Sequence, residues 1–411
     1  MRGGRVGVVG GSIAGCAAAL AAVRGGADEV VVFERATGEL QGRGVGLGVN
    51  VERYAELRDS GFVDDSMPWL PVRTRRWFAQ GKESALGREV ANLPFTIRAY
   101  NWGSLWHELR RRIPASVDYR AGAAVAAVRD GDSGAQVVLA DGTGERFDLV
   151  IGADGYRSVA RAALFPEAQP EYAGYFLWRG TFPAGRLAEL DGLLGPGESW
   201  AADDSFTVGV PNGHMVAYRI PGSGTDDQVM NWGLYAQAPT TALGVEIDEP
   251  TSIPPGAMTD TLLDYLLAQA DELLPPYWAG LVRLTAPERF FVQPIYDLEV
   301  PSYVGRRVLL AGDAASVARP HSGAGAVKAL QDAATLERSW SRAAGWSGLL
   351  ADYGAVRLPA GRAAVSLGRR IGQDQVVEAP AWADLDAAGF EAWLASTMRA
   401  DAFGGRSLDA R

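Results

Sequence analysis

The sequence predicts an α/β fold in which a parallel sheet is interrupted by an antiparallel sheet and followed by C-terminal helices. Three observations predict this class. Continuous apolar runs next to glycine occur at 6–9, 149–151 and 308–311, which is typical of strands buried on both faces of a parallel sheet. From about 172 to 235, aromatic and polar residues alternate between Gly/Pro turn signals, which indicates antiparallel strands. The segment 349–371 has a helical pattern.

The N-terminal segment predicts a βαβ unit. A strand at 6–9, a helix at 13–24 and a second strand at 30–33 follow one another. The apolar stretch 6–23 resembles the core of a signal peptide, but Gly10-Gly11-Ser12 interrupts it with a turn signal. No other window approaches the ~20 uninterrupted apolar residues of a membrane span, so we expect no membrane partner.

Later segments continue the same pattern. A helix is expected at 101–112, and strands at 136–139 and 149–151 are expected to return to the first sheet. The strand at 307–311 and a helix from about 326 to 340 come after the antiparallel region. The antiparallel sheet is therefore predicted to be an insertion.

Composition and charge exclude some classes of partner. The chain has 411 residues, 47% hydrophobic and 21% charged, which is typical of a globular protein with two or three units. The net charge of −10 gives no overall positive field, so nucleic acid is not expected to bind. The nearest basic groups are Arg73, Arg75 and Arg76 and the run 110–112, all predicted to lie on solvated faces.

Cysteine and histidine usage excludes other chemistry. Cys16 is the only cysteine, so neither an intramolecular disulfide nor a cysteine metal cluster can form, and a cytoplasmic location is expected. His107, His214 and His321 lie far apart in the sequence and show no metal-ligand spacing. We therefore predict no metal site.

The first candidate site is the turn Gly10–Gly15, in the position of a GxGxxG turn between strand and helix. Gly10 permits the tight turn and Gly15 the close packing of the helix, whose free N–H groups suit a pyrophosphate. Ser12 stands where a second glycine is usual and can donate to phosphate. The candidate contacts in this turn are Gly10, Ser12, Ile13, Ala14 and Gly15. A βαβ turn without a ligand remains an alternative.

Glu34 closes the second strand, where a carboxylate accepts both ribose hydroxyls of an adenosine and disfavours a 2′-phosphate. Arg35 follows it as a further candidate contact. The glycines of 42–48 alternate, which favours a loop lying close to a flat ligand, although a flexible surface loop is equally compatible. Arg43 in that loop is a candidate contact for the flat part of such a ligand or for its pyrophosphate.

Two further motifs follow buried strands. Asp154, in Gly-Ala-Asp-Gly, would place a carboxylate at the edge of the sheet where α/β folds bind ligands, or would form an Asx turn. Asp313, in Gly-Asp-Ala-Ala, can accept from a ribityl hydroxyl. Small residues then open the next helix so that a planar ring can approach its positive end. They are Gly323, Ala324, Gly325 and Ala326.

The order of these three motifs resembles the group A flavoprotein aromatic hydroxylases, the p-hydroxybenzoate hydroxylase family. The similarity spans about 5 to 340. Within the family, 10–13, 172–175 with Trp178-Arg179-Gly180, and 319–321 are most similar to the 2,6-dihydroxypyridine 3-hydroxylase-like monooxygenases.

The resemblance implies a Rossmann-like domain with noncovalent FAD, and NADH or NADPH as a transient reductant. It implies that a flavin C4a-hydroperoxide, formed with O2, hydroxylates a small electron-rich aromatic or heteroaromatic substrate. The protein is expected to be a monomer or a homodimer. The expected units are a discontinuous FAD-binding domain at 1–70, 100–170 and 285–345, a substrate-binding β-sheet domain at 71–99 and 171–284, and a C-terminal helical segment at 346–411.

The inserted sheet is the expected substrate site. Its aromatic residues would either line a dry slot or form the core. They are Trp178, Trp200, Phe206, Tyr218, Trp232 and Tyr235. Tyr218 and Arg179 are candidates because each has a polar group on an apolar body. His321, in the loop that the family places beside the flavin, is a candidate acid/base group or a structural histidine.

Three positions depart from the family pattern, in which His, Asn and Arg or Gln are usual. They are Ser316, Val327 and Trp102. These departures leave open the alternative that the chain binds flavin without catalysing a reaction. An NAD-dependent dehydrogenase explains only the first motif and Glu34. Epoxidation or oxidative rearrangement is an alternative within the monooxygenase class.

Overall fold

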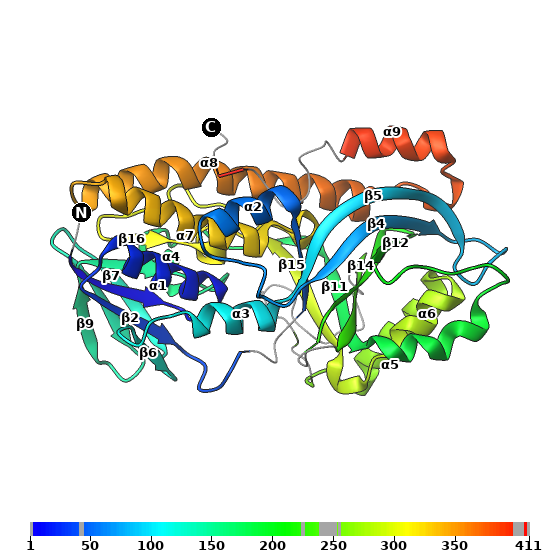
Figure 1. Cartoon of the computed structure of the whole chain (residues 1–411), viewed down its shortest axis with the longest axis horizontal. Helices are drawn as coiled ribbons and strands as arrows, with labels where there is room; N and C mark the ends of the chain where they lie inside the picture. Colours follow the sequence, from blue (N-terminus) through cyan, green and yellow to red (C-terminus); the bar gives the residue numbers. More distant parts are fainter. Residues whose placement is uncertain are drawn as a thin grey trace.

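The computed structural model describes residues 3–40, 45–222, 227–237, 253, 256–397 and 407–408. This part of the chain contains three sheets of five, eight and three strands. The five-stranded sheet lies at one end of an elongated molecule and the eight-stranded sheet at the other (Figure 1). In this region, no helix has both the length and the apolar character to cross a membrane.

The five-stranded sheet is parallel, as the apolar runs predict. Its order is β16-β10-β1-β2-β6. These strands are β1 (Arg5–Val9), β2 (Glu29–Glu34), β6 (Asp118–Ala121), β10 (Leu149–Gly152) and β16 (Val308–Leu310). Helices α1 (Ile13–Gly25) and α7 (Ala324–Arg342) pack against each other, and each follows a strand of this sheet. Loops after β1, β10 and β16 therefore meet at one edge of the sheet.

The prediction that 136–139 returns to the first sheet is wrong. This segment belongs to β8 (Ala135–Leu139), which pairs antiparallel with β7 (Val125–Asp130) and β9 (Gly144–Phe147). The connections between these strands are short, and short connections favour hairpin pairing with the sequence neighbour. Of the two segments predicted to return, 136–139 and 149–151, only the second, in β10, joins the parallel sheet.

The eight-stranded sheet has the order β15-β11-β14-β13-β12-β4-β5-β3 and is antiparallel except between β12 and β4. Its strands are β3 (Gly46–Asn50), β4 (Leu70–Ala79), β5 (Arg88–Asn101), β11 (Glu171–Pro183), β12 (Asp204–Val210), β13 (Gly213–Pro221), β14 (Gln228–Gln237) and β15 (Phe291–Asp297). The expected glycine loop is a strand from Gly46 onward. Both β3 and β15 come from the segments 1–70 and 285–345, which the sequence analysis assigns to the FAD-binding domain.

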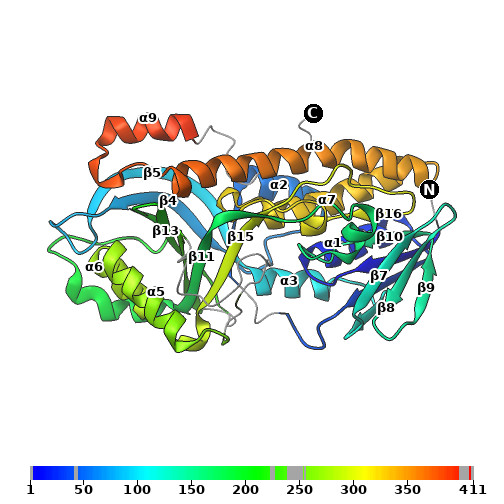
Figure 2. The same cartoon turned by 180° about the vertical axis from the view of Figure 1, so that it is seen from behind.

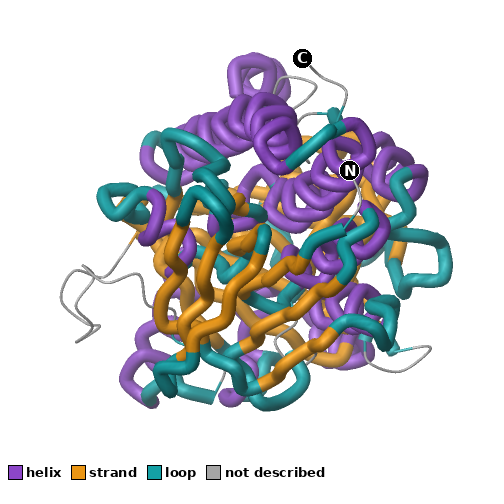
Figure 3. Tube along the Cα trace, turned by 90° about the vertical axis from the view of Figure 1, so that its left-hand side faces the viewer, coloured by secondary structure: helices purple, strands orange, loops and turns teal. Residues whose placement is uncertain are grey.

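Helices cover both sheets. α5 (Asp260–Leu273) and α6 (Pro276–Arg283) lie on one face of the eight-stranded sheet, and α8 (Trp346–Gly372) runs along both sheets (Figures 1 and 2). Seen from the end with the N terminus, helices gather over one side of the strands (Figure 3). The remaining helices are α2 (Val51–Asp59), α3 (Trp102–Arg111), α4 (Val159–Leu164) and α9 (Ala387–Thr397).

Candidate active site

A cavity of about 430 Å³ lies between the ligand edge of the parallel sheet and one face of the eight-stranded sheet. The parallel-sheet side contributes residues of the loops after β1, β10 and β16. The other side contributes residues of all eight strands of that sheet. The cavity therefore joins the two regions that the sequence assigns to cofactor and substrate.

The turn after β1 has the geometry that its glycines predict. Gly10 has a φ of +97°, and a Cβ at Gly15 would lie 1.9 Å from the Gly10 carbonyl oxygen. Ser12 is the N-cap residue of α1, yet its side chain makes no capping bond. Ser12, Ile13 and Ala14 line the cavity, whereas Gly10 and Gly15 support the turn from behind. The positive end of α1 thus opens into the cavity.

Glu34 lies at the end of β2, outside the cavity-lining residues. Its carboxylate accepts from the backbone N–H of Gly11 at 2.7 Å and of Ala36 at 2.8 Å. Each oxygen keeps a second acceptor site, because an ionised carboxylate has about four. The side chain of Arg35 is exposed. Arg43 lies outside the described residues.

The carboxylate of Asp154, a candidate ligand contact, is bound to other groups of the protein. Its carboxylate accepts from the Ser158 hydroxyl at 2.5 Å and from the Val159 N–H at 2.7 Å, and so caps α4. Burial raises the pKa of this carboxyl. Ala153 and Gly155, on either side of it, line the cavity. These bonds reach residues four to six positions along the chain, so they cap α4 and do not form the Asx turn that was the alternative, while the neighbouring backbone faces the cavity.

Asp313 faces the cavity with a free carboxylate. Among the described residues its side chain has no hydrogen-bond partner, and burial raises its pKa. The backbone just before it is held on both sides. The Gly312 N–H donates to Asp332 at 2.8 Å, and Lys328 donates to the Gly312 carbonyl at 2.6 Å. Arg357 donates to the other oxygen of Asp332 at 2.6 Å.

The start of α7 leaves open space. Gly323, with a φ of +63°, is the N-cap residue and offers no capping side chain. Gly323, Gly325 and Ala326 line the cavity, whereas Ala324 is buried beneath them. A Cβ at Gly325, or at Gly155 on the opposite loop, would meet nothing within 4 Å. Two helix N-termini, an unpartnered carboxylate and this open space fit a dinucleotide with a planar ring.

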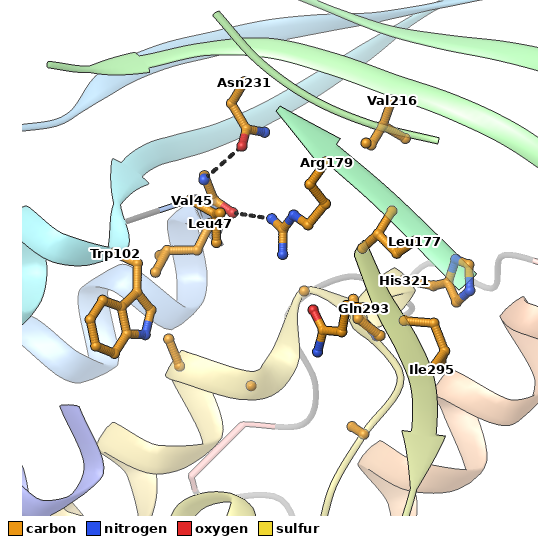
Figure 4. A pocket seen from close by; sticks show the side chains of 18 of the residues that line it. Val45, Leu47, Trp102, Leu177, Arg179, Val216, Asn231, Gln293, Ile295 and His321 are labelled. Carbon is orange, nitrogen blue, oxygen red and sulfur yellow. Dashed lines mark hydrogen bonds between the residues drawn. The ribbon is translucent and has the colours of Figure 1, made fainter. Parts of the chain in front are cut away.

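Arg179 and Tyr218 line the cavity on the sheet side. Arg179 donates to the Gly46 carbonyl at 3.5 Å, and Asn231 accepts from the Gly46 N–H at 2.9 Å (Figure 4). Burial lowers the pKa of Arg179 and raises that of Tyr218 to about 12. A Cβ at Gly46 would lie 2.7 Å from the Tyr218 hydroxyl, so only glycine allows this close approach.

His321 lies apart from Arg179, near Ile295 (Figure 4). Its Nε2 is 2.8 Å from the Tyr175 hydroxyl, and its ring stacks on Tyr235 with centroids 4.0 Å apart. Burial lowers its pKa well below the ordinary value. The ring is therefore neutral at pH 7 and a weak base. His214 also lines the cavity, stacked on Tyr235, whereas the structure does not place His107 there.

The predicted aromatic residues divide between the two faces of the sheet. Trp178, Trp200 and Trp232 pack in the core beneath α5 and α6, which is the core alternative for these three residues. Tyr218 and Tyr235 line the cavity, and Phe206 contacts both core and cavity. The division follows strand alternation, because successive side chains point to opposite faces.

Arg75 is the clearest residue that sequence reasoning misplaced. It lines the cavity, whereas its neighbour Arg73 is 72% exposed and pairs with Asp203. Strict alternation would put both arginines on one face, but an irregularity in the β4–β5 pairing between Val72 and Thr74 changes the side on which they lie. Alternation from Tyr218 and Tyr235, together with the pairing of Leu177 on β15, leads to other polar residues of the cavity. They are His214, Asn231 and Gln293.

Comparison with known proteins supports the same assignment. No protein-family model matches the chain. It is 31% identical to 2,6-dihydroxypyridine 3-monooxygenase of Paenarthrobacter nicotinovorans over 82% of this chain and 83% of that protein. It is 30% identical to aurachin C monooxygenase/isomerase of Stigmatella aurantiaca, over 89% and 88% of the two chains. It is also 30% identical to a Pseudomonas putida salicylate hydroxylase, over 81% and 76%.

A solved structure is also similar over nearly the whole chain. The 2,6-dihydroxypyridine-3-hydroxylase of Arthrobacter nicotinovorans aligns with a TM-score of 0.80 and 27% identity, over 99% of this chain and 98% of that one. The relatives are aromatic hydroxylases that use FAD with NAD(P)H as reductant, and they do not favour a dehydrogenase or a flavin-binding protein without turnover. The chain therefore belongs to the FAD-dependent aromatic hydroxylases and is a monooxygenase.

Proposed function

We propose that the cavity holds noncovalent FAD against the N-termini of α1 and α7, and that a small electron-rich aromatic or heteroaromatic substrate binds on the sheet side. The observation that carries the proposal is the cavity itself. One space joins two helix N-termini and the free carboxylate of Asp313 to a sheet face bearing Arg179 and Tyr218. When bound, FAD supplies with NAD(P)H and O2 the oxygen-transfer chemistry, which protein side chains lack.

The cofactor-side residues are assigned by their chemistry. The free N–H groups of α1 and the Ser12 hydroxyl bind the pyrophosphate. Glu34 accepts from the adenosine ribose, and Asp313 accepts from a ribityl hydroxyl. Arg35 and Arg43 remain predicted contacts. Asp154 is a positioning residue, because its cap on α4 fixes the backbone of Gly155 at the cavity.

The isoalloxazine ring is assigned to the space in front of α7. Gly323, Gly325 and Ala326 leave room for a flat ring, and the helix N-terminus favours negative charge at its N1–C2 edge. On the sheet side, Arg179 and Tyr218 orient the substrate. His321 donates to or accepts from a substrate hydroxyl as a neutral ring, because its pKa is too low for a strong base at pH 7.

Besides orienting the substrate, the side chains of Arg179, Tyr218 and His321 help to enclose it. A site that excludes water favours transfer of oxygen to the substrate over release of hydrogen peroxide. We further propose that the protein works as a monomer or homodimer in the cytoplasm, where the free thiol of Cys16 stays reduced.

The test is product analysis with purified protein, NADH or NADPH, oxygen and a panel of hydroxylated aromatics. We expect yellow protein with releasable FAD, substrate-stimulated NAD(P)H oxidation and a hydroxylated product. A rearranged or epoxidised product would correct the reaction type. Protein that stays colourless after incubation with FAD would contradict the proposal.

A further inference from the structure

Lys328 is a buried cation to which the proposed function gives no role. It lies near the start of α7, only 3% of it is exposed, and its Nζ donates to the Gly312 carbonyl at 2.6 Å. A neutral donor would satisfy this carbonyl, whereas burying a charge has a large free-energy cost unless a counter-charge compensates it. The charge of Lys328 therefore calls for a separate explanation.

Asp332, the acid one turn along α7, compensates Lys328 only at a distance. Its Oδ2 lies 3.8 Å from the Lys328 Nζ, which is beyond hydrogen-bond distance. The same oxygen accepts from the Gly312 N–H at 2.8 Å, and Oδ1 accepts from the Arg357 Nε at 2.6 Å. Asp332 is thus paired directly with Arg357, and much of the charge of Lys328 can act on another group.

The free carboxylate of Asp313 belongs to the residue next to that carbonyl. The carbonyl carbon of Gly312 is bonded to the Asp313 nitrogen, so the ammonium of Lys328 binds the peptide group from which Asp313 starts. On the other side, the buried Arg161 of α4 donates to the Ala314 carbonyl at 3.4 Å. Two buried cations therefore bind the carbonyls on either side of Asp313, and both keep these partners whether or not its carboxyl is ionised.

The groups around Asp313 act on its pKa in opposite directions. Burial, the largest effect, raises the pKa, Lys328 lowers it, Asp332 raises it and Arg161 lowers it. Bound FAD would exclude more water from the carboxylate and so raise its pKa further. A neutral carboxyl is a weaker acceptor for a ribityl hydroxyl than a carboxylate is. Other titratable groups that act on these residues are Asp154, Tyr303 and Arg357.

We propose that Lys328 is a positioning residue whose charge keeps Asp313 ionised when FAD covers it. The inference rests on the proposed function and deepens it, because it names the group that maintains the acceptor assigned to the ribityl chain. Lys328 acts through Asp313 and does not itself line the cavity. Without this charge, FAD binding is expected to bring a proton onto Asp313.

The test counts the protons that are taken up when FAD binds to the full-length protein prepared without cofactor. Calorimetric titration in two buffers with different ionisation enthalpies gives this number. Repeating the titration from about pH 6 to 8 gives the pH dependence of the affinity. Lys328→Gln is the variant, because its amide can still donate to the Gly312 carbonyl while the charge is lost.

The wild-type protein should take up almost no proton over this range, so its FAD affinity should not depend on pH. In Lys328→Gln, the pKa of Asp313 is expected to be higher in the FAD complex than in the free protein. Binding should therefore take up as much as one proton. The affinity should then fall as the pH rises, by up to about tenfold per pH unit, which is the slope for one linked proton.

Two further variants show whether Asp313 is the group that takes up the proton. Lys328→Gln combined with Asp313→Asn has no carboxyl to protonate there, so it should lose both the proton uptake and the pH dependence. Arg342→Gln is the matched control, because it removes one positive charge from the exposed last turn of the same helix. It should behave like the wild type.

Thermal unfolding reports whether each variant folds, and Lys328→Met is the alternative if Lys328→Gln does not. The wild type and Asp313→Asn provide a test without any change at Lys328. Proton uptake by the wild type that is absent in Asp313→Asn would overturn the inference.

The remaining outcomes separate this inference from the proposed function. A Lys328→Gln variant that binds FAD without proton uptake, or uptake that persists in the double variant, contradicts this inference alone. Wild-type protein that does not bind FAD contradicts the proposed function.

Discussion

The two sides of the cavity satisfy their charges in opposite ways. On the cofactor side, the carboxylates of Glu34, Asp154 and Asp332 accept from backbone N–H groups and hold loops in place. On the sheet side, Arg75 and Arg179 have no acidic partner in the described structure. A charge with a partner inside the protein holds the site in shape, while a charge without one is available to a ligand. Asp313 is the cofactor-side group of the second kind.

The largest effect is expected from removing Asp332, the carboxylate at the centre of the partnered cluster formed with Arg357, Lys328 and the Gly312 N–H. Asp332→Ala leaves Arg357 and Lys328 as buried cations and frees the Gly312 N–H. Breaking such a cluster costs about 3–5 kcal/mol, so the free energy of unfolding measured in urea should fall by this amount. The FAD content of the purified variant should fall as well.

Glu337→Ala is the control on the same helix, because its ion pair with Arg24 is half-buried at the surface and 3.5 Å long. Its effect should be below about 1 kcal/mol. If Asp332→Ala destabilises the protein no more than Glu337→Ala, the partnered cluster does not support the site.

Removing the free carboxylate of Asp313 should lower the rate of hydroxylation more than the stability of the folded protein. Asp313→Ala removes an assigned ribityl contact without exposing another buried charge, so thermal stability of the apoprotein should change little. With saturating FAD, a misplacement of about 1 Å near the reacting centre lowers the hydroxylation rate on the order of a hundredfold. More of the consumed NAD(P)H should end as hydrogen peroxide. Wild-type coupling in the FAD-saturated variant would show that Asp313 does not position the flavin.

Glu34 belongs to both classes, since it holds two backbone N–H groups and is assigned to the ribose. Glu34→Ala should weaken FAD binding by about 1.5–3 kcal/mol, the contribution of a hydrogen bond to a charged group. Titration with FAD measures the change. Glu29→Ala, on the same strand with a solvent-exposed ion pair to Arg5, should leave the affinity unchanged. Equal FAD affinities of the Glu34→Ala and Glu29→Ala variants would contradict the assignment of Glu34 to the ribose.

The smallest effect concerns pH. Burial, followed by the charge of Arg75, lowers the pKa of His214 from 6.5 to about 3. Below pH 6.5 the unfolded chain therefore binds a proton that the folded protein does not, and stability is lost as the pH falls toward 3. His214→Asn should show a shallower loss of unfolding free energy between pH 7 and about 5. The same slope in both proteins would mean that His214 is not buried as a neutral ring.

Sequence reasoning succeeded where local sterics decide. The turn from Gly10 to Gly15 was predictable because a Cβ at Gly10 or at Gly15 would collide with a backbone carbonyl oxygen, so both positions require glycine. It failed at Arg75, because the irregularity between Val72 and Thr74 that redirects it is set by strand pairing. The split of Trp178 from Tyr218 also depends on which face of the sheet α5 and α6 cover, and alternation alone does not choose a face.

The most direct test of the account is the fate of oxygen in the wild-type reaction. The holoprotein is incubated with NAD(P)H, an aromatic compound that binds, and isotopically labelled dioxygen in ordinary water. The account predicts a hydroxylated ring that carries one labelled oxygen atom, with little labelled hydrogen peroxide. A product oxygen that comes from water, or NAD(P)H consumption that ends entirely as hydrogen peroxide with every aromatic compound that binds, would contradict it.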